Sequence, residues 1–171
     1  MSEEYRIPKH KVAVTVGFPG KPDVQMYVFL GETAQTHAGT ERPSDLLNGR
    51  EPFFPVVDYD GGIHFVHRDA LSVLTAPADR EFREDLFGEE DRAPAEATNL
   101  AVEVELEDGR SLEGRVCYLM PRGQRRLQDV LNLETRFLVL RAGTRALLIN
   151  KRRIEKISPK AEDGEGGRGQ D

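Results

Sequence analysis

The sequence predicts a mainly β protein made of two tandem, diverged, five-stranded small barrels or rolls. Each has one short helical turn, and an acidic linker joins the two. Three observations predict this: polar and apolar residues alternate along short segments, turn-forming residues separate these segments, and the pattern occurs twice in the same order. The expected bounds are 8–76 and 98–159 for the repeats, 77–97 for the linker, which could hold a short helix, and 160–171 for a disordered acidic Gly-rich tail.

The internal repeat is carried by short matching blocks that keep their order along the chain. The longest matching pairs are KVAVTV (11–16) with NLAVEV (99–104), RPSDLLN (42–48) with RLQDVLN (126–132), and VHRDALSVL (66–74) with INKRRIEKI (149–157). Each repeat lies near the lower size limit for independent folding. Packing of the repeats into a shared core and free movement on the linker both remain open at this point.

In the first repeat, period-two alternation and turn residues predict five strands, at 12–16, 24–30, 53–59, 62–66 and 70–74. The breaker cluster 18–23 separates the first two strands. Ser44 is expected to cap a helical turn that ends at Asn48. Gly61 and Gly62 turn the chain before the fourth strand, and residues 67–69 form a one-turn connection to the fifth.

The second repeat shows the same succession, with strands predicted at 102–106, 111–120, 136–141, 145–149 and 154–158. Asp108 and Gly109 form a tight hairpin turn, since Asp-Gly accommodates positive φ. A helical turn is expected at 127–133, and residues 150–153 connect the last two strands. Cys117 falls in an apolar strand and is expected to be buried and inert.

Composition restricts the class of protein. Hydrophobic residues make up 38% of the chain and charged residues 32%, and no window approaches the ~18 uninterrupted apolar residues of a membrane span. The single cysteine excludes a disulfide scaffold, and the first residues lack the pattern of a signal peptide. We therefore expect a cytoplasmic protein without membrane association. The excess of arginine (18) over lysine (6) indicates a GC-rich, bacterial genome.

Charge is unevenly distributed along the chain. The net charge is −6, yet residues 110–158 hold 12 basic and 4 acidic groups. Acidic segments flank this stretch at 79–98 and 161–171. Such asymmetry indicates an interaction surface on the second repeat, although it is also compatible with solvated polar faces.

The second repeat resembles known small β domains. DGRSLEGRV (108–116) and LLINKRRIEKI (147–157) resemble strands of the Sm-like and SH3-like small barrels, although Sm proteins begin with a helix and here the helical turn follows the second strand. RLQDVLN (126–132), FLVL (137–140) and INKRRIEKI (149–157) resemble a little-characterised bacterial small-domain family of unknown function. These resemblances imply a fold and transfer no catalytic residue.

Candidate catalytic and metal sites are not found in the sequence. Phosphate-binding loops and nucleophile elbows do not occur, so we expect no enzyme activity and no cofactor. The histidines lack the spacing of a metal site. The repeated motif is expected to be structural, with Arg and Asp side by side on a helical turn and Asn as a left-handed cap. It comprises Arg42, Asp45 and Asn48 in the first repeat, and Arg126, Asp129 and Asn132 in the second.

Two basic clusters are the candidate binding residues: Arg122, Arg125 and Arg126, then Lys151, Arg152 and Arg153. The leading hypothesis is a non-catalytic protein–protein interaction module, a bacterial regulatory or signalling adaptor whose basic face attracts an acidic protein partner. The alternative is RNA or single-stranded nucleic-acid binding by the same face, although stacking aromatics are not interleaved with it. The protein's own acidic linker or tail is a further candidate for that face. Homo-oligomers through strand edges are also expected.

Overall fold

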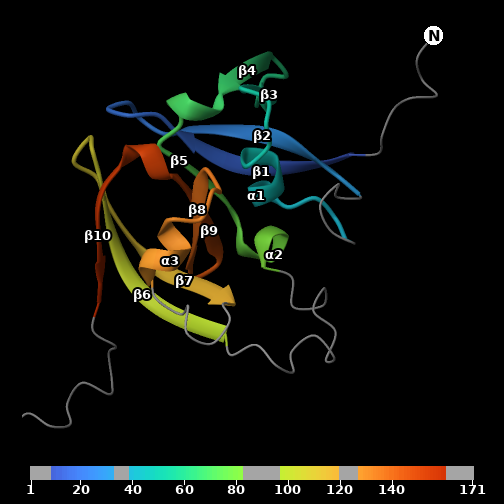
Figure 1. The fold of residues 1–171 in the computed structure, drawn as a ribbon. Coiled ribbons are helices and arrows are strands. Elements are labelled where there is room, and N and C mark those ends of the chain that lie inside the picture. The colour runs from blue at the N-terminus through green and yellow to red at the C-terminus, as the bar shows by residue number, and fades with distance from the viewer. Residues whose placement is uncertain (1–8, 33–38, 83–96, 120–126, 161–171) are drawn as a thin grey trace, which may run out of the picture.

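The computed structural model describes residues 9–32, 39–82, 97–119 and 127–160. These residues form one antiparallel sheet of ten strands with a few short helices, so the prediction of a mainly β protein is confirmed (Figure 1). The first repeat supplies β1 (Lys9–Gly17), β2 (Val24–Gly31), β3 (Phe53–Asp58), β4 (Ile63–His67) and β5 (Val73–Pro77). The second repeat supplies β6 (Ala97–Leu106), β7 (Ser111–Leu119), β8 (Phe137–Ala142), β9 (Arg145–Asn150) and β10 (Ile154–Pro159).

The helical elements are single turns at the predicted places. In the described residues they are α1 (Pro43–Leu47), η2 (Arg68–Ala70), α2 (Ala78–Glu81), α3 (Leu127–Leu131) and η5 (Lys151–Arg153). The fifth strand of the first repeat begins three residues later than predicted, because η2 takes the first residue of the expected strand, Ala70. Within the predicted linker, α2 follows β5 directly, and residues 83–96 lie outside the described part of the chain.

Both repeats have the same strand order. The sheet runs β10-β6-β7-β8-β9-β5-β1-β2-β3-β4, so in each half the fifth strand pairs with the first. The prediction of tandem small barrels or rolls is not confirmed in this form, because the sheet remains open. Such a barrel would close by bringing its fourth strand toward its fifth. Here the fourth strand of the second repeat, β9, pairs instead with the fifth strand of the first repeat, β5, over Val73–Pro77.

The repeats also agree residue by residue. In the first, Phe53 lies opposite His67 on the neighbouring strand, and in the second Phe137 lies opposite Asn150. The side chains of His67 and Asn150 both accept a hydrogen bond from the backbone N–H two residues later, at the start of η2 and η5. The sequence repeat is therefore also a structural one, and equivalent positions can be compared directly.

The two repeats share their apolar core. The core cluster of the first repeat includes Phe137, Ala146 and Leu148 from β8 and β9, and that of the second includes Val73 from β5. Polar contacts join the repeats at the β1–β2 and β6–β7 turns, where Arg110 Nη1 lies 2.9 Å from Asp23 Oδ1. The repeats are therefore packed together by both apolar and charged contacts.

Candidate interaction surfaces

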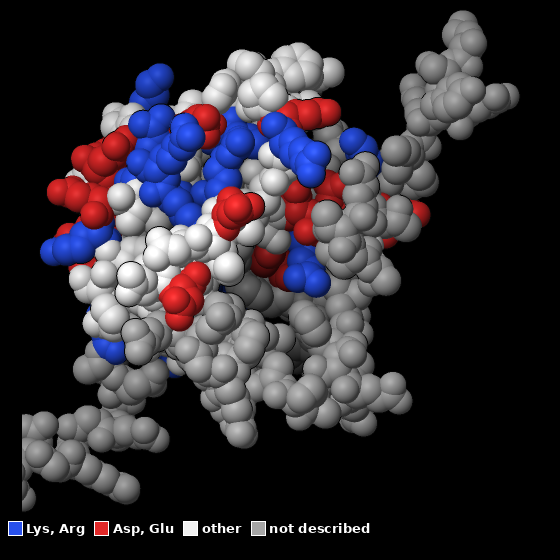
Figure 2. Space-filling view, in the orientation of Figure 1, with Lys and Arg blue, Asp and Glu red and all other residues white. Residues whose placement is uncertain are grey.

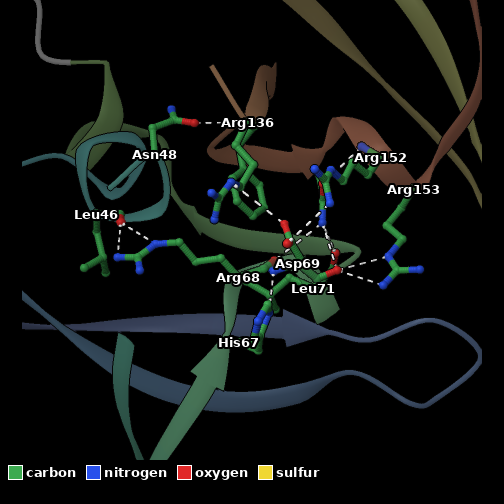
Figure 3. A network of polar contacts seen from close by, with 11 residues as sticks. Leu46, Asn48, His67, Arg68, Asp69, Leu71, Arg136, Arg152 and Arg153 are labelled. Carbon is green, nitrogen blue, oxygen red and sulfur yellow. Dashed lines mark hydrogen bonds and ion pairs between the residues drawn. The ribbon is translucent and has the colours of Figure 1, made fainter. Parts of the chain in front are cut away.

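At the junction between the repeats, polar contacts join Asp69 of the first repeat to Arg152 and Arg153 of the second (Figure 3), and a buried asparagine takes part in the same network. Asn150 ends β9 and is 0% exposed. Its Nδ2 donates to the carbonyl oxygens of Arg68, Asp69 and Leu71 at 3.4, 3.2 and 2.9 Å. Its Oδ1 accepts from the backbone N–H of Arg152 at 3.0 Å. One side chain thus satisfies carbonyls of the first repeat while it caps η5 of the second.

The predicted basic cluster at η5 takes part in the same junction. Arg153 Nη2 and Nε donate to the Asp69 carbonyl at 2.8 and 3.2 Å, and its Nη1 donates to Glu107 Oε1 at 2.8 Å. Arg152 Nη1 lies 3.5 Å from Asp69 Oδ2, but its side chain is 76% exposed. Arg153 therefore joins the repeats, while Arg152 is oriented towards solvent.

The third member of this cluster, Lys151, makes its hydrogen bonds within the second repeat. Its Nζ donates to the Leu133 carbonyl at 3.0 Å and to Thr135 Oγ1 at 3.1 Å. Partial burial lowers the pKa of Lys151. The other predicted candidates, Arg122, Arg125 and Arg126, lie outside the described residues.

Basic side chains gather on the face of the molecule that carries η5, with acidic side chains around them (Figure 2). Arg68, a buried basic residue of the first repeat, was missed by sequence reasoning. Its Nη2 and Nε donate to the Leu46 carbonyl at 2.8 and 3.2 Å, and its Nη1 to the Phe53 carbonyl at 3.4 Å. Burial lowers its pKa, and the charge of Arg136 adds to this effect. Arg68 is equivalent to Lys151, and the basic residue common to both repeats was the available signal.

The repeated Arg-x-x-Asp motif caps a helical turn in the first repeat, but not as expected. Arg42, and not Ser44, is the N-cap of α1, and Asp45 Oδ2 accepts from the Arg42 backbone N–H at 2.8 Å. The prediction of a left-handed Asn48 is wrong, since its φ is −87°. Instead Asn48 Oδ1 accepts from the backbone N–H of Phe137 at 2.9 Å, so this side chain ties α1 to β8. The prediction of a left-handed conformation is also wrong for Asn132, because no described residue other than glycine has positive φ.

An apolar surface that the sequence analysis did not single out lies on the β3–β4 hairpin at one end of the sheet. Ile63 and Phe65 of β4 are 66% and 70% exposed, and Phe53 of β3 is 51% exposed. On the turn between the strands, the exposed ring of Tyr59 stacks on Tyr27, with ring centroids 4.6 Å apart. The signal was the sequence of β4 itself, because Ile-His-Phe-Val places apolar residues on both faces of one short strand.

A buried carboxyl group lies where α2 meets α1. Glu81 is buried, and its Oε2 accepts from the Ser44 backbone N–H at 3.0 Å. Burial raises the pKa of Glu81, although the hydrogen bonds from Ser44 and the charge of Arg42 oppose this effect. The folded protein therefore favours the protonated form of this group more than the unfolded chain does.

Replacing Glu81 with Gln is expected to stabilise the protein at neutral pH. The wild type gains stability from this group below its unfolded pKa of about 4.5, and loses it as pH rises through the raised pKa of the folded state. E81Q should therefore have the same stability as the wild type at low pH, where Glu81 is protonated, and a higher stability at pH values where Glu81 ionises. Urea unfolding followed by circular dichroism at several pH values measures this difference. Asp79→Asn, a matched change at an exposed residue of the same helix, should show no such trend. A gain for E81Q that does not change with pH would contradict this assignment.

Comparison with protein-family models, curated proteins and solved structures found no match for this chain. The resemblance to Sm-like and SH3-like barrels and to the bacterial domain family stays a prediction. Among the described residues, no group of three or more His, Cys, Asp or Glu side chains is placed to hold a metal ion. Within the same ranges no helix has the length and apolarity needed to cross a membrane.

Proposed function

We propose that the protein is a non-catalytic protein-interaction module, an adaptor that binds its partner through the β3–β4 hairpin. The observation that carries this proposal is the exposure of Ile63 and Phe65 on a strand at the open end of the sheet. Soluble monomers rarely leave such apolar patches uncovered unless the patch is an interaction site. The backbone of an edge strand also offers unpaired N–H and C=O groups to a partner strand.

A charged side chain lies beside the aromatic end of this apolar patch, as at the rims of typical interfaces. Lys11 Nζ lies 4.0 Å from the centroid of the Tyr27 ring. On the opposite face of β4, His64 Nε2 lies 2.7 Å from Asp58 Oδ2, and the pKa of Asp58 is lowered by this hydrogen bond and by the Gly62 N–H. An apolar strand face with a charged group beside it favours a folded protein partner over a small apolar ligand.

The basic face around η5 is the second candidate surface, because basic side chains gather there (Figure 2). It would steer an acidic partner toward the module, with Arg152 as the exposed contact. RNA or single-stranded nucleic acid is the alternative ligand of this face. That alternative predicts affinity that falls steeply with added salt.

Affinity capture with the full chain tests the proposed function. The wild type, Phe65→Asp and Gln25→Asp would each be used to recover ligands from nuclease-treated and untreated lysate. Gln25 is an exposed residue of β2, so its variant controls for the added charge. We expect the wild type and Gln25→Asp to recover one discrete protein from both nuclease-treated and untreated lysate. Phe65→Asp should not recover that protein. Recovery that disappears with nuclease would favour the nucleic-acid alternative, and equal recovery by all three chains would place the site elsewhere.

A further inference from the structure

We propose that the partner of the hairpin is a second copy of this chain, bound head to tail. The outer face and free edge of β3–β4 in one copy receive α3 and β10 of the next copy. This inference rests on the proposed function, because it names the occupant of the same surface. It follows from the interface inside the chain, since both halves of that interface recur at the two ends of the sheet.

One half of the internal interface is the outer face of β8 and β9. Phe137, Ala146 and Leu148 on this face join the core of the first repeat and are at most 2% exposed. The strand registers equate these residues with residues of the first repeat: Phe53 with Phe137, Ile63 with Ala146, and Phe65 with Leu148. The β3–β4 surface is therefore the exposed equivalent of a face that the chain buries elsewhere.

The other half of the internal interface is formed by α1, the end of η2 and β5. Its residues Leu47, Leu71 and Leu74 lie in the same core cluster and are fully buried. The repeat equates them with Leu131, Ile154 and Ile157, which are only partly buried. Leu133 follows α3, two residues after Leu131, and is 48% exposed. In the first repeat these apolar side chains cover β8 and β9. The second repeat has apolar side chains at the equivalent positions, but no described strands of this chain lie against them in the same way.

A specific hydrogen bond of the internal interface also has free equivalents. Asn48 accepts from the Phe137 N–H, and the corresponding pair is Asn132 and the Phe53 N–H. The Asn132 side chain is exposed. The Phe53 N–H faces away from β4, and none of the described residues accepts a hydrogen bond from it. A second copy would bring these two groups together.

The internal strand pairing sets the register expected between copies. Within the chain, Leu74 of β5 lies opposite Leu148 of β9. The equivalent intermolecular pair is Ile157 of β10 opposite Phe65 of β4. Two apolar side chains would then meet across the strands, as they do inside the chain.

Pro159 makes the intermolecular ladder weaker than the internal one. The backbone N–H of Lys160 donates to the Ala101 carbonyl of β6, at 2.8 Å. Alternation along the strand therefore turns the amide position of Pro159 toward the free edge, where proline has no N–H to donate. The association is expected to be reversible and dependent on concentration. Its two surfaces differ, so it forms rings or open chains of copies and not a symmetric pair.

Sedimentation velocity of the full chain across the micromolar range tests this proposal. Phe65→Asp blocks the hairpin surface, and Leu133→Asp blocks the surface beside α3. Gln25→Asp is the matched control, because Gln25 is exposed on β2, outside the hairpin, and strand pairing equates it with Glu113, which is exposed as well. The wild type and the control should associate, while each blocking variant should raise the dissociation constant at least about tenfold.

Mixing the two blocking variants gives the sharpest result. Each keeps one intact surface, so an equimolar mixture should form a one-to-one heterodimer and nothing larger. A wild type that is monomeric throughout, or a mixture that stays monomeric although both variants keep wild-type thermal unfolding, would overturn the inference. Should either variant fold poorly, Ile63→Asp and Asn132→Ala replace it at the same surfaces. If the wild type is monomeric but captures a different protein that Phe65→Asp does not capture, this inference fails and the proposed function stands.

Discussion

Replacing Asn150 with Ala is expected to lower the free energy of unfolding by about 3 kcal/mol or more. The substitution removes a fully buried amide that donates to three carbonyls of the first repeat. The Leu71 carbonyl would lose its donor, the carbonyls of Arg68 and Asp69 would keep only the Leu71 N–H and Arg153, and η5 would lose its cap. Urea unfolding followed by far-UV circular dichroism measures this loss, and the absence of tryptophan makes fluorescence a poor substitute.

The matched control for this substitution is His67→Ala. His67 occupies the equivalent position, but its side chain makes one capping hydrogen bond, from the Asp69 N–H at 3.1 Å. Its loss should cost about 0.5–2 kcal/mol, the usual range for a helix cap. Equal losses for the two variants would show that Asn150 acts only as a cap and does not join the repeats.

Replacing Arg68 with Ala is expected to destabilise the protein by about 2–4 kcal/mol. The buried guanidinium donates to the Leu46 carbonyl at the end of α1 and to the Phe53 carbonyl at the start of β3. It also lies over the Phe54 ring, 5.3 Å from its centroid. Removal would leave a cavity and take the donor from the Phe53 carbonyl, while the Leu46 carbonyl would keep its bond from the Gly49 N–H. Thermal and urea unfolding would measure the effect.

Two further variants separate the geometry of Arg68 from its charge. Arg68→Lys keeps the charge but cannot supply the planar fork that reaches both carbonyls, so it should recover only part of the lost stability. Arg152→Ala removes an exposed arginine of the same basic face and should change stability by less than about 0.5 kcal/mol. If Arg68→Ala were as mild as Arg152→Ala, the bonds to Leu46 and Phe53 would contribute little.

Most strands could be predicted because their determinants are local. Alternation in β1 and β6 reports which face meets a core, and turns such as Asp108-Gly109 fix where strands end. The way the sheet is assembled could not be predicted in this way. The assembly depends on whether β5 pairs with β4, the fourth strand of its own repeat, or with β9 of the second repeat. Both β4 and β9 contain apolar residues that could lie opposite β5.

The candidate sites show the same limit. Basic residues 151–153 were visible in the sequence, but their partners Asp69 and Glu107 lie far away along the chain. Only the fold shows that Arg153 is engaged internally while Arg152 is not. The exposed hairpin was missed because solvent exposure of Phe65, against burial of Leu148, depends on which repeat lies over each strand.

The place of β5 between β1 and β9 also bears on how the chain is synthesised. When the first repeat has been made, β9 does not yet exist, so the second edge of β5 has no strand to pair with. Thr75 can pair with Leu147 only after the ribosome has synthesised β9. Contacts between such distant residues slow folding, and a nascent chain with an open apolar edge is prone to aggregation. The join that unites the repeats therefore makes folding of the first repeat depend on translation of the second.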